Sequence, residues 1–165
     1  MDRIRYLSNW DRKDTEYLKS FSDKNRDPEE FVQQLIELIA DSDAQSAATW
    51  LLKNEFSGIE FSNEQSELIL SSLNKLTHWD SQLHVLQFLH RLEISKSRKK
   101  ELEEFLRKSL ISDNKFVRAW AYNGFDILAE RFGEYRQEVD QFLEMGLRDE
   151  PASVKARIRN ILKSK

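Results

Sequence analysis

Three histidines lie close together in the sequence and are the first residues that suggest chemistry. His78, His84 and His90 are spaced six residues apart, and imidazole is the side chain that titrates near neutral pH and ligates metals. Six residues of helix turn through about 600°, so His84 and His90 are expected on different faces. Asp80 and His84 share a face, but two ligands without a third make a poor metal site. The sequence therefore predicts no metal, and for His84 a buried, hydrogen-bonded position.

Neighbouring acidic residues are the second feature to test for chemistry. Paired carboxylates do acid–base work when burial moves their pKa values apart. Here the pairs fall at expected helix starts or on outer faces, where solvation and the helix dipole explain them. The four glycines are isolated, so no glycine-rich phosphate loop exists. We therefore expect no catalytic residues and no cofactor. The acidic pairs are Glu29–Glu30, Glu103–Glu104 and Asp149–Glu150.

Length and composition favour one all-helical domain. A chain of 165 residues with only 4 Gly and 2 Pro has few of the turn-forming residues that a many-stranded fold requires. The absence of cysteine fits a reducing compartment. No run resembles a signal peptide, and none approaches the ~20 apolar residues of a membrane span. We expect a cytoplasmic monomer without a membrane contact.

Charge is unevenly distributed along the chain. The net charge is −3, yet residues 28–150 hold 14 basic and 23 acidic side chains, and residues 151–165 hold five basic ones and no acid. Two explanations of the basic end stay open: complementation of a helix dipole and a docking patch for an acidic partner. The five cations are Lys155, Arg157, Arg159, Lys163 and Lys165.

The most regular pattern lies between Asp113 and Phe132. Apolar residues recur there at helical spacing, and Asp113 is the expected N-cap. A second set, containing Phe116, Trp120 and Ile127, lies off this stripe. A helix that is apolar on more than one side is expected to be packed between neighbours. The stripe comprises Val117, Ala121, Gly124, Phe125, Leu128 and Phe132.

The same pattern recurs along the chain. Four acids, each expected to cap the second helix of a pair, are followed by core positions four and eight residues later, and they are separated by shifts of 37, 33 and 37 residues. The sequence thus predicts two-helix units at 28–57, 62–94, 96–132 and 134–163. The acids are Asp43, Asp80, Asp113 and Glu150, or Asp149 beside it.

Residues 1–27 are expected to form an N-terminal capping helix. Ser8, Asp11 or Asp14 would begin it, and it would run to about Phe21. The residue before a proline is pushed out of the helical region, so Asp27–Pro28 should end this segment and begin the first unit.

The pattern Asp113, Val117, Arg118, and its partial repeat at Val154–Lys155, resembles HEAT and armadillo-type repeats. This resemblance implies an α-α superhelix of about four HEAT-like repeats in a single domain, 1–165. It also implies that the second helices line a concave binding side, and it implies no chemistry.

Candidate binding residues follow from positions on the second helices. Trp50 and Trp120 come seven residues after their acids, with Gln87 and Arg157 at the equivalent positions. This flank indicates either packing between adjacent second helices or an aromatic rim of a groove. The face opposite the core holds small and amide side chains that suit a partner or plain solvent. It comprises Thr49, Lys53, Leu86, His90, Ala119, Asn123, Ala156 and Asn160.

Two functions are compatible with these features. The first is a non-catalytic scaffold that binds a protein or peptide on the second helices, through Trp50, Lys53, Gln87, His90, Trp120, Asn123, Arg157 and Asn160. The alternative is a nucleic-acid-binding protein resembling HEAT-like DNA alkylation repair glycosylases, with Trp120 and Asp126 as the working pair. The net charge of −3 opposes the alternative.

Overall fold

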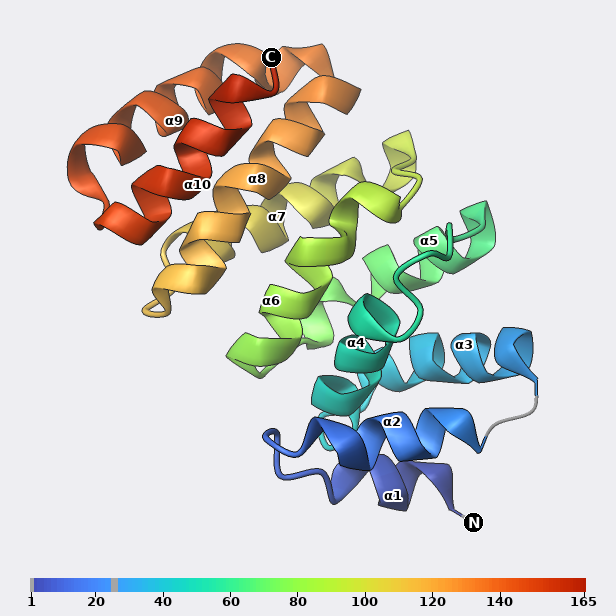
Figure 1. The fold of residues 1–165 in the computed structure, drawn as a ribbon. Coiled ribbons are helices and arrows are strands. Elements are labelled where there is room, and N and C mark those ends of the chain that lie inside the picture. Colours follow the sequence, from blue (N-terminus) through green and yellow to red (C-terminus); the bar gives the residue numbers. More distant parts are fainter. Residues whose placement is uncertain (1, 25–26) are drawn as a thin grey trace. The chain divides into compact units, whose positions relative to one another are not determined.

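A computed structural model describes residues 2–24 and 27–165, and within these ranges the chain forms helices and connections but no strand (Figure 1). The all-α class predicted from the sequence is confirmed. The chain divides into two compact units, Met1–Glu93 and Ile94–Lys165. We refer to them as unit 1 and unit 2 and describe each by itself. The single domain and the number of repeats stay predictions.

Unit 1 opens with two short helices, α1 (Arg3–Ser8) and α2 (Thr15–Asp23). The expectation of one helix starting at Ser8, Asp11 or Asp14 is correct only for α2, whose first turn donates to the Asp14 side chain. The sequence missed α1. A tight turn separates the two helices, because Asp11 accepts hydrogen bonds from two backbone amides and Arg12 adopts a left-handed φ of 66°.

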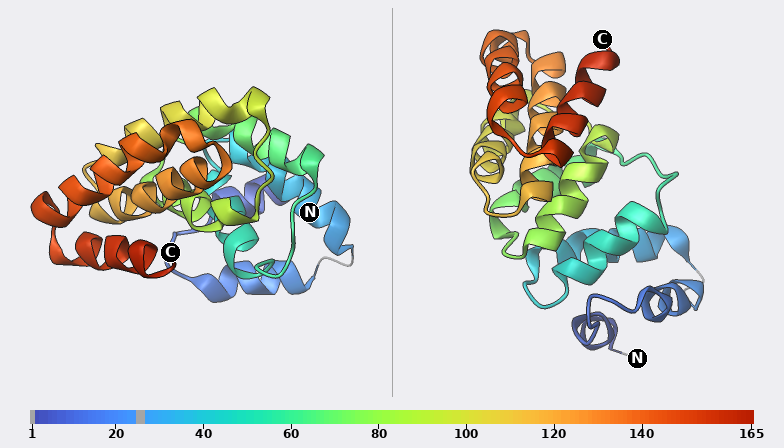
Figure 2. Two further views of the ribbon diagram at one scale, coloured as in Figure 1. Left: turned by 90° about the horizontal axis from the view of Figure 1, so that it is seen from above. Right: turned by 60° about the vertical axis from the view of Figure 1, so that its left-hand side comes forward.

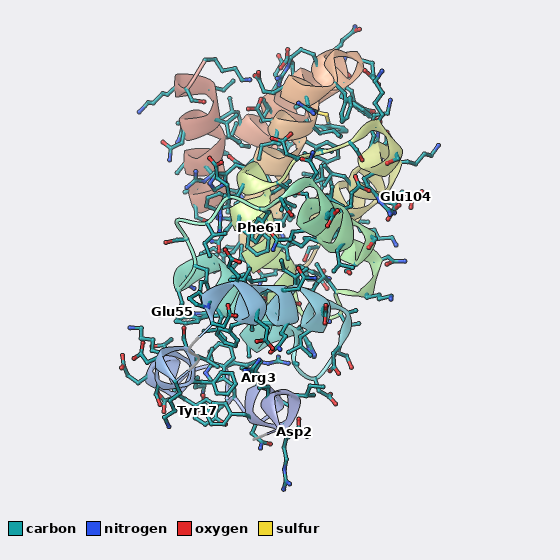
Figure 3. The ribbon with its side chains drawn as sticks, turned by 90° about the vertical axis from the view of Figure 1, so that its right-hand side faces the viewer. Asp2, Arg3, Tyr17, Glu55, Phe61 and Glu104 are labelled. Carbon is teal, nitrogen blue, oxygen red and sulfur yellow. The ribbon has the colours of Figure 1, made fainter. Side chains whose placement is uncertain are left out.

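Aromatic side chains attach these two helices to the rest of unit 1. The ring of Tyr6 stacks on Tyr17, with 4.3 Å between centroids, and on Phe21 at 4.4 Å. Phe21 then meets the edge of Phe31 at 5.6 Å. Figure 3 labels Tyr17 on α2 beside this cluster. The N-terminal segment is therefore part of the unit 1 core.

The remainder of unit 1 consists of two pairs of helices. They are α3 (Pro28–Glu37) with α4 (Gln45–Asn54), and α5 (Asn63–Ser71) with α6 (Trp79–Phe88). Single 3-10 turns extend three of them: η1 (Leu38–Ala40), η2 (Leu73–Lys75) and η3 (Leu89–Arg91). The first pair lies within residues 28–57 and the second within 62–94; Pro28 begins α3, and a Ser62–Gln65 capping box begins α5.

Arg91 fixes the connection between the two pairs. Its guanidinium donates to the carbonyl oxygens of Leu52 and Ile59, each at 2.9 Å, and lies 4.6 Å from the ring centroid of Phe61. Phe61 is buried and packs against Phe88 (Figure 3). One side chain thus satisfies carbonyls near the end of α4 and covers an aromatic pair in the core.

Unit 2 is built around α8 (Lys115–Arg131), which contacts α7 (Lys99–Leu110), α9 (Arg136–Asp149) and α10 (Ala152–Lys163). Figures 1 and 2 show α10 beside α8 and α9. Two 3-10 turns, η4 (Lys96–Arg98) and η5 (Gly133–Tyr135), precede α7 and α9. The apolar stripe of α8 is buried throughout, as the sequence predicts.

The predicted N-caps of the second helices are wrong. Asn114, not Asp113, accepts from the first turn of α8. The other three acids are also no caps: α4 and α10 begin after Ala44 and Pro151, and Asp80 lies inside α6. Spacing locates an acid to within one or two residues of a helix start, whereas capping depends on which backbone amides the carboxylate reaches.

Candidate interaction surfaces

The four candidate residues of unit 1 lie on α4, α6 and η3 and differ in exposure. Trp50 is half-buried against Trp10, with 6.1 Å between ring centroids. Lys53 is half-buried, and burial lowers its pKa. Gln87 is half-buried, with its side-chain oxygen lacking a partner among the described residues, and His90 is exposed. Trp50 therefore packs against the N-terminal segment.

Three of the eight positions on the face expected to lie opposite the core are buried. Thr49 and Leu86 in unit 1 have no exposed surface, and Ala119 in unit 2 is 6% exposed. The interpretation of these positions as an accepting or solvated surface is wrong. Second helices pack side by side, α4 against α6 and α8 against α10, and this contact removes part of the expected face.

Hydrogen bonds hold α4 against α6, a feature that the sequence analysis missed. The Ser46 hydroxyl donates to Asp80 at 2.8 Å, and Thr49 Oγ1 lies 2.9 Å from His84 Nδ1. Gln45, which is fully buried, donates to the Lys75 carbonyl and accepts from the amide of Thr77 and the hydroxyl of Ser81. Ser46 and Thr49 correspond to Leu83 and Leu86 of the next second helix, so the spacing gave no signal of this contact.

The geometry of this polar contact is suited to holding α4 and α6 together. His84 is buried and hydrogen-bonded, as predicted, and burial lowers its pKa to about 4. The imidazole is therefore neutral near pH 7. Ser46 donates to Asp80 rather than to His84, so in this contact the serine hydroxyl is not paired with the histidine. Among residues 2–24 and 27–165, no three His, Cys, Asp or Glu side chains cluster as metal ligands.

A cavity of about 350 Å³ lies at the N-terminal side of this contact. Trp10, Arg12, Ser46 and His78 contribute to its lining. Arg12 Nε lies 3.8 Å from the Asp80 carboxylate, and His78 Nε2 is hydrogen-bonded to the Ser42 carbonyl. Arg12, Ser46 and His78 of the lining thus already have polar partners.

In unit 2, the four candidate residues lie on α8 and α10. The guanidinium carbon of Arg157 lies 4.1 Å from the ring centroid of Trp120, and both side chains are half-buried. Asn123 is half-buried and Asn160 exposed, and neither amide has a hydrogen-bond partner within the described parts of the chain. We call Trp120, Asn123, Arg157 and Asn160 the Trp120 surface.

Ion pairs fix the helices that carry the Trp120 surface. Glu150, at the α9–α10 joint, accepts from Arg118 at 3.1 Å and from the Tyr122 hydroxyl at 3.2 Å. Burial, with the nearby Glu150 carboxylate, raises the pKa of Tyr122 to about 12. In the motif Asp113, Val117, Arg118, it is thus Arg118 that has a structural role, because it joins α8 to the α9–α10 joint. Asp113 does not cap the helix.

Asp126, named with Trp120 for the nucleic-acid alternative, is held by two cations. Its carboxylate lies 2.9 Å from Arg136 and 2.6 Å from Lys165. Six residues separate it from Trp120, which places the two about 120° apart around the helix axis. The structure therefore does not bring these two residues together at one site.

Comparison of the chain with protein families, curated proteins and solved structures gives no match. Within residues 2–24 and 27–165, every helix is too short or too polar to cross a bilayer.

Proposed function

We propose that this protein is a non-catalytic, HEAT-like scaffold that binds a protein partner through its second helices, with the Trp120 surface as the principal contact. The observation that supports this proposal most directly is the half-exposed Trp120–Arg157 pair at 4.1 Å. Tryptophan and arginine are the residues most enriched among those that dominate binding energy at protein interfaces.

The environment of this pair is suited to recognition. The Trp120 ring and the Arg157 guanidinium already contact each other, so little side-chain conformational entropy is lost when a partner binds. The amides of Asn123 and Asn160 provide donors and acceptors beside it, and Phe116, which is 49% exposed, adds apolar area on α8. The surface thus combines an anchored aromatic centre with a polar rim.

The candidate residues of unit 1 support the proposal more weakly. His90 is exposed, but the unpaired oxygen of Gln87 is buried and Trp50 is held by Trp10. We assign these residues of unit 1 to a secondary contact with the partner. The absence of cysteine supports the cytosol as the compartment.

The test compares partner binding by the wild type and a Trp120→Ala, Asn123→Ala variant. A protein captured from cytosol on the wild type would be purified, and its affinity for each form measured by calorimetry. We expect a loss of about 2 kcal/mol or more of binding free energy if Trp120 is a central contact. Circular dichroism would first establish that both forms are equally helical.

Trp79→Ala is the matched control, because Trp79 is an exposed tryptophan in unit 1, at 50%. Its affinity should equal that of the wild type. Equal binding by all three forms would exclude the Trp120 surface. Recovery of nucleic acid in place of a protein, with affinity falling steeply with salt, would support the nucleic-acid alternative instead.

A further inference from the structure

Three cations form a row along α10 that is separate from the Trp120 surface. Lys155, Arg159 and Lys163 are spaced four residues apart, so they follow one face at intervals of about 6 Å. Arg159 and Lys163 are exposed and Lys155 half-buried. Within the described ranges, none of the three has an ion-pair partner. We call these residues the cation row.

The helix dipole does not explain this row. A cation is favoured in the last turn of a helix, which here contains only Lys163. Lys155 is the fourth residue of α10, near the end where the dipole disfavours positive charge. Like charges four residues apart also repel each other within the helix. The row therefore works against the local stability of α10.

Several cations of unit 2 are paired with carboxylates, unlike the three of the row. Arg107 lies 2.6 Å from Glu138, and Lys99 lies 2.6 Å from Glu134. Helices α7 and α9 carry both signs of charge, whereas α10 carries no acid. Even Lys165, just beyond α10, contacts Asp126 and Glu130. The row is thus a local excess of charge that the fold does not neutralise.

We propose that the cation row is a docking site for an acidic helical segment of a partner protein. Carboxylates at the same four-residue spacing would face the three cations, and charge complementarity of this kind sets register and association rate. Leu162, which is 41% exposed and lies three residues after Arg159, supplies an apolar contact beside the row. The occupant is therefore acidic along one face with an apolar residue at its edge.

A short acidic segment fits this chain better than a long polyanion. The row covers only about 12 Å of helix. Residues 1–93 hold 10 basic and 17 acidic side chains and the whole chain has a net charge of −3, which disfavours a long polyanion as the partner. A segment of two or three helical turns covers the row alone.

The experiment measures binding of three labelled probes to the full chain by fluorescence anisotropy at ~50 mM salt, where screening is weak. The probes are a helical peptide with glutamates at four-residue spacing and an adjacent leucine, the same peptide with glutamines, and a DNA duplex. Phosphatidylserine vesicles form a fourth arm, measured by sedimentation. We expect the glutamate peptide to bind, and the Lys155→Glu, Arg159→Glu, Lys163→Glu variant to bind it at least about tenfold more weakly, since each exposed pair contributes modestly.

The control variant is Lys100→Glu, Lys108→Glu, Arg148→Glu, which changes net charge equally at exposed positions on α7 and α9. This control should bind the glutamate peptide like the wild type. A peptide with lysines in place of the glutamates should bind the Lys155→Glu, Arg159→Glu, Lys163→Glu variant. An equal loss in both variants would mean attraction by net charge alone and overturn the proposal. Tighter row-dependent binding of duplex or vesicles, or no binding of the glutamate peptide, would overturn it as well. Trp120→Ala should leave this affinity unchanged, which separates this site from the Trp120 surface.

Discussion

At the scale of single residues, His84 shows how burial determines what a titratable group can do. Its ring is 8% exposed and lies against Thr49 in the α4–α6 contact. Burial lowers the pKa from an ordinary value of 6.5 to about 4, and Lys53 adds to this shift while Asp80 opposes it. The folded protein therefore keeps His84 neutral over a range in which the unfolded chain binds a proton.

His84 should make the free energy of unfolding pH-dependent. Its contribution is fully present above about pH 6.5 and is lost as the pH falls towards 4, because only the unfolded state takes up the proton there. Urea unfolding of the wild type and His84→Gln should show that the wild type loses roughly 2 kcal/mol more between about pH 7 and about pH 5. His90→Gln, at an exposed position, should retain the wild-type slope. Identical slopes for all three proteins would show that His84 titrates normally.

At the scale of elements, Gly146 sets how closely α9 approaches its neighbours. A Cβ atom at this position would lie 2.5 Å from Cδ1 of Ile158 on α10 and 2.9 Å from Cζ of Tyr122 on α8. Both neighbours are buried, so neither side chain can swing into solvent. A residue without a side chain is therefore required where three helices meet.

Gly146→Ala should destabilise the protein by about 1–2 kcal/mol, because overpacking of a few kcal/mol exceeds the gain in helix propensity of roughly 1 kcal/mol. Denaturant unfolding measures the difference. Gly133→Ala is the matched control, since nothing lies within 4 Å of a Cβ there. A Gly146→Ala protein as stable as this control would mean that α9 and α10 separate without cost.

At the scale of the whole molecule, the two units differ in charge and in the contacts that the second helices make within each unit. Unit 1 holds 10 basic and 17 acidic residues, and unit 2 holds 16 and 12. The α4–α6 contact in unit 1 is rich in hydrogen bonds, whereas in unit 2 Ile158 and Tyr122 are buried where α8, α9 and α10 meet. Unit 2 thus has an apolar core of its own.

A fragment spanning residues 94–165 should fold by itself. Its four helices enclose their own apolar residues, although a chain of this size buries a smaller fraction of its surface and is expected to be only marginally stable. Far-ultraviolet circular dichroism should give a helical spectrum and a cooperative thermal transition below that of the full chain. A gradual loss of signal on heating would instead show that unit 2 depends on residues 1–93.

The sequence alone determined the helical class, the start of α3 at Pro28 and the buried stripe of α8. These features depend on local periodicity and on the conformational preference of proline, which act within one or two turns. The sequence also placed His84 in the interior, because the position repeats a core position of the other units. The local sequence pattern was sufficient to predict a feature wherever that feature depends on residues of the same helix.

Only the tertiary structure decided which partly polar faces are free. Thr49 and Leu86 belong to a face that a helical wheel directs outward, yet both are buried, Thr49 against His84 of the neighbouring second helix. Asp80 was expected to cap and instead accepts from Ser46. Conversely, the unpaired state of the cation row became visible only once the partners of the other cations were known. Hydrogen bonds and ion pairs between elements join residues about 30 positions apart, and spacing within one helix carries no information about them.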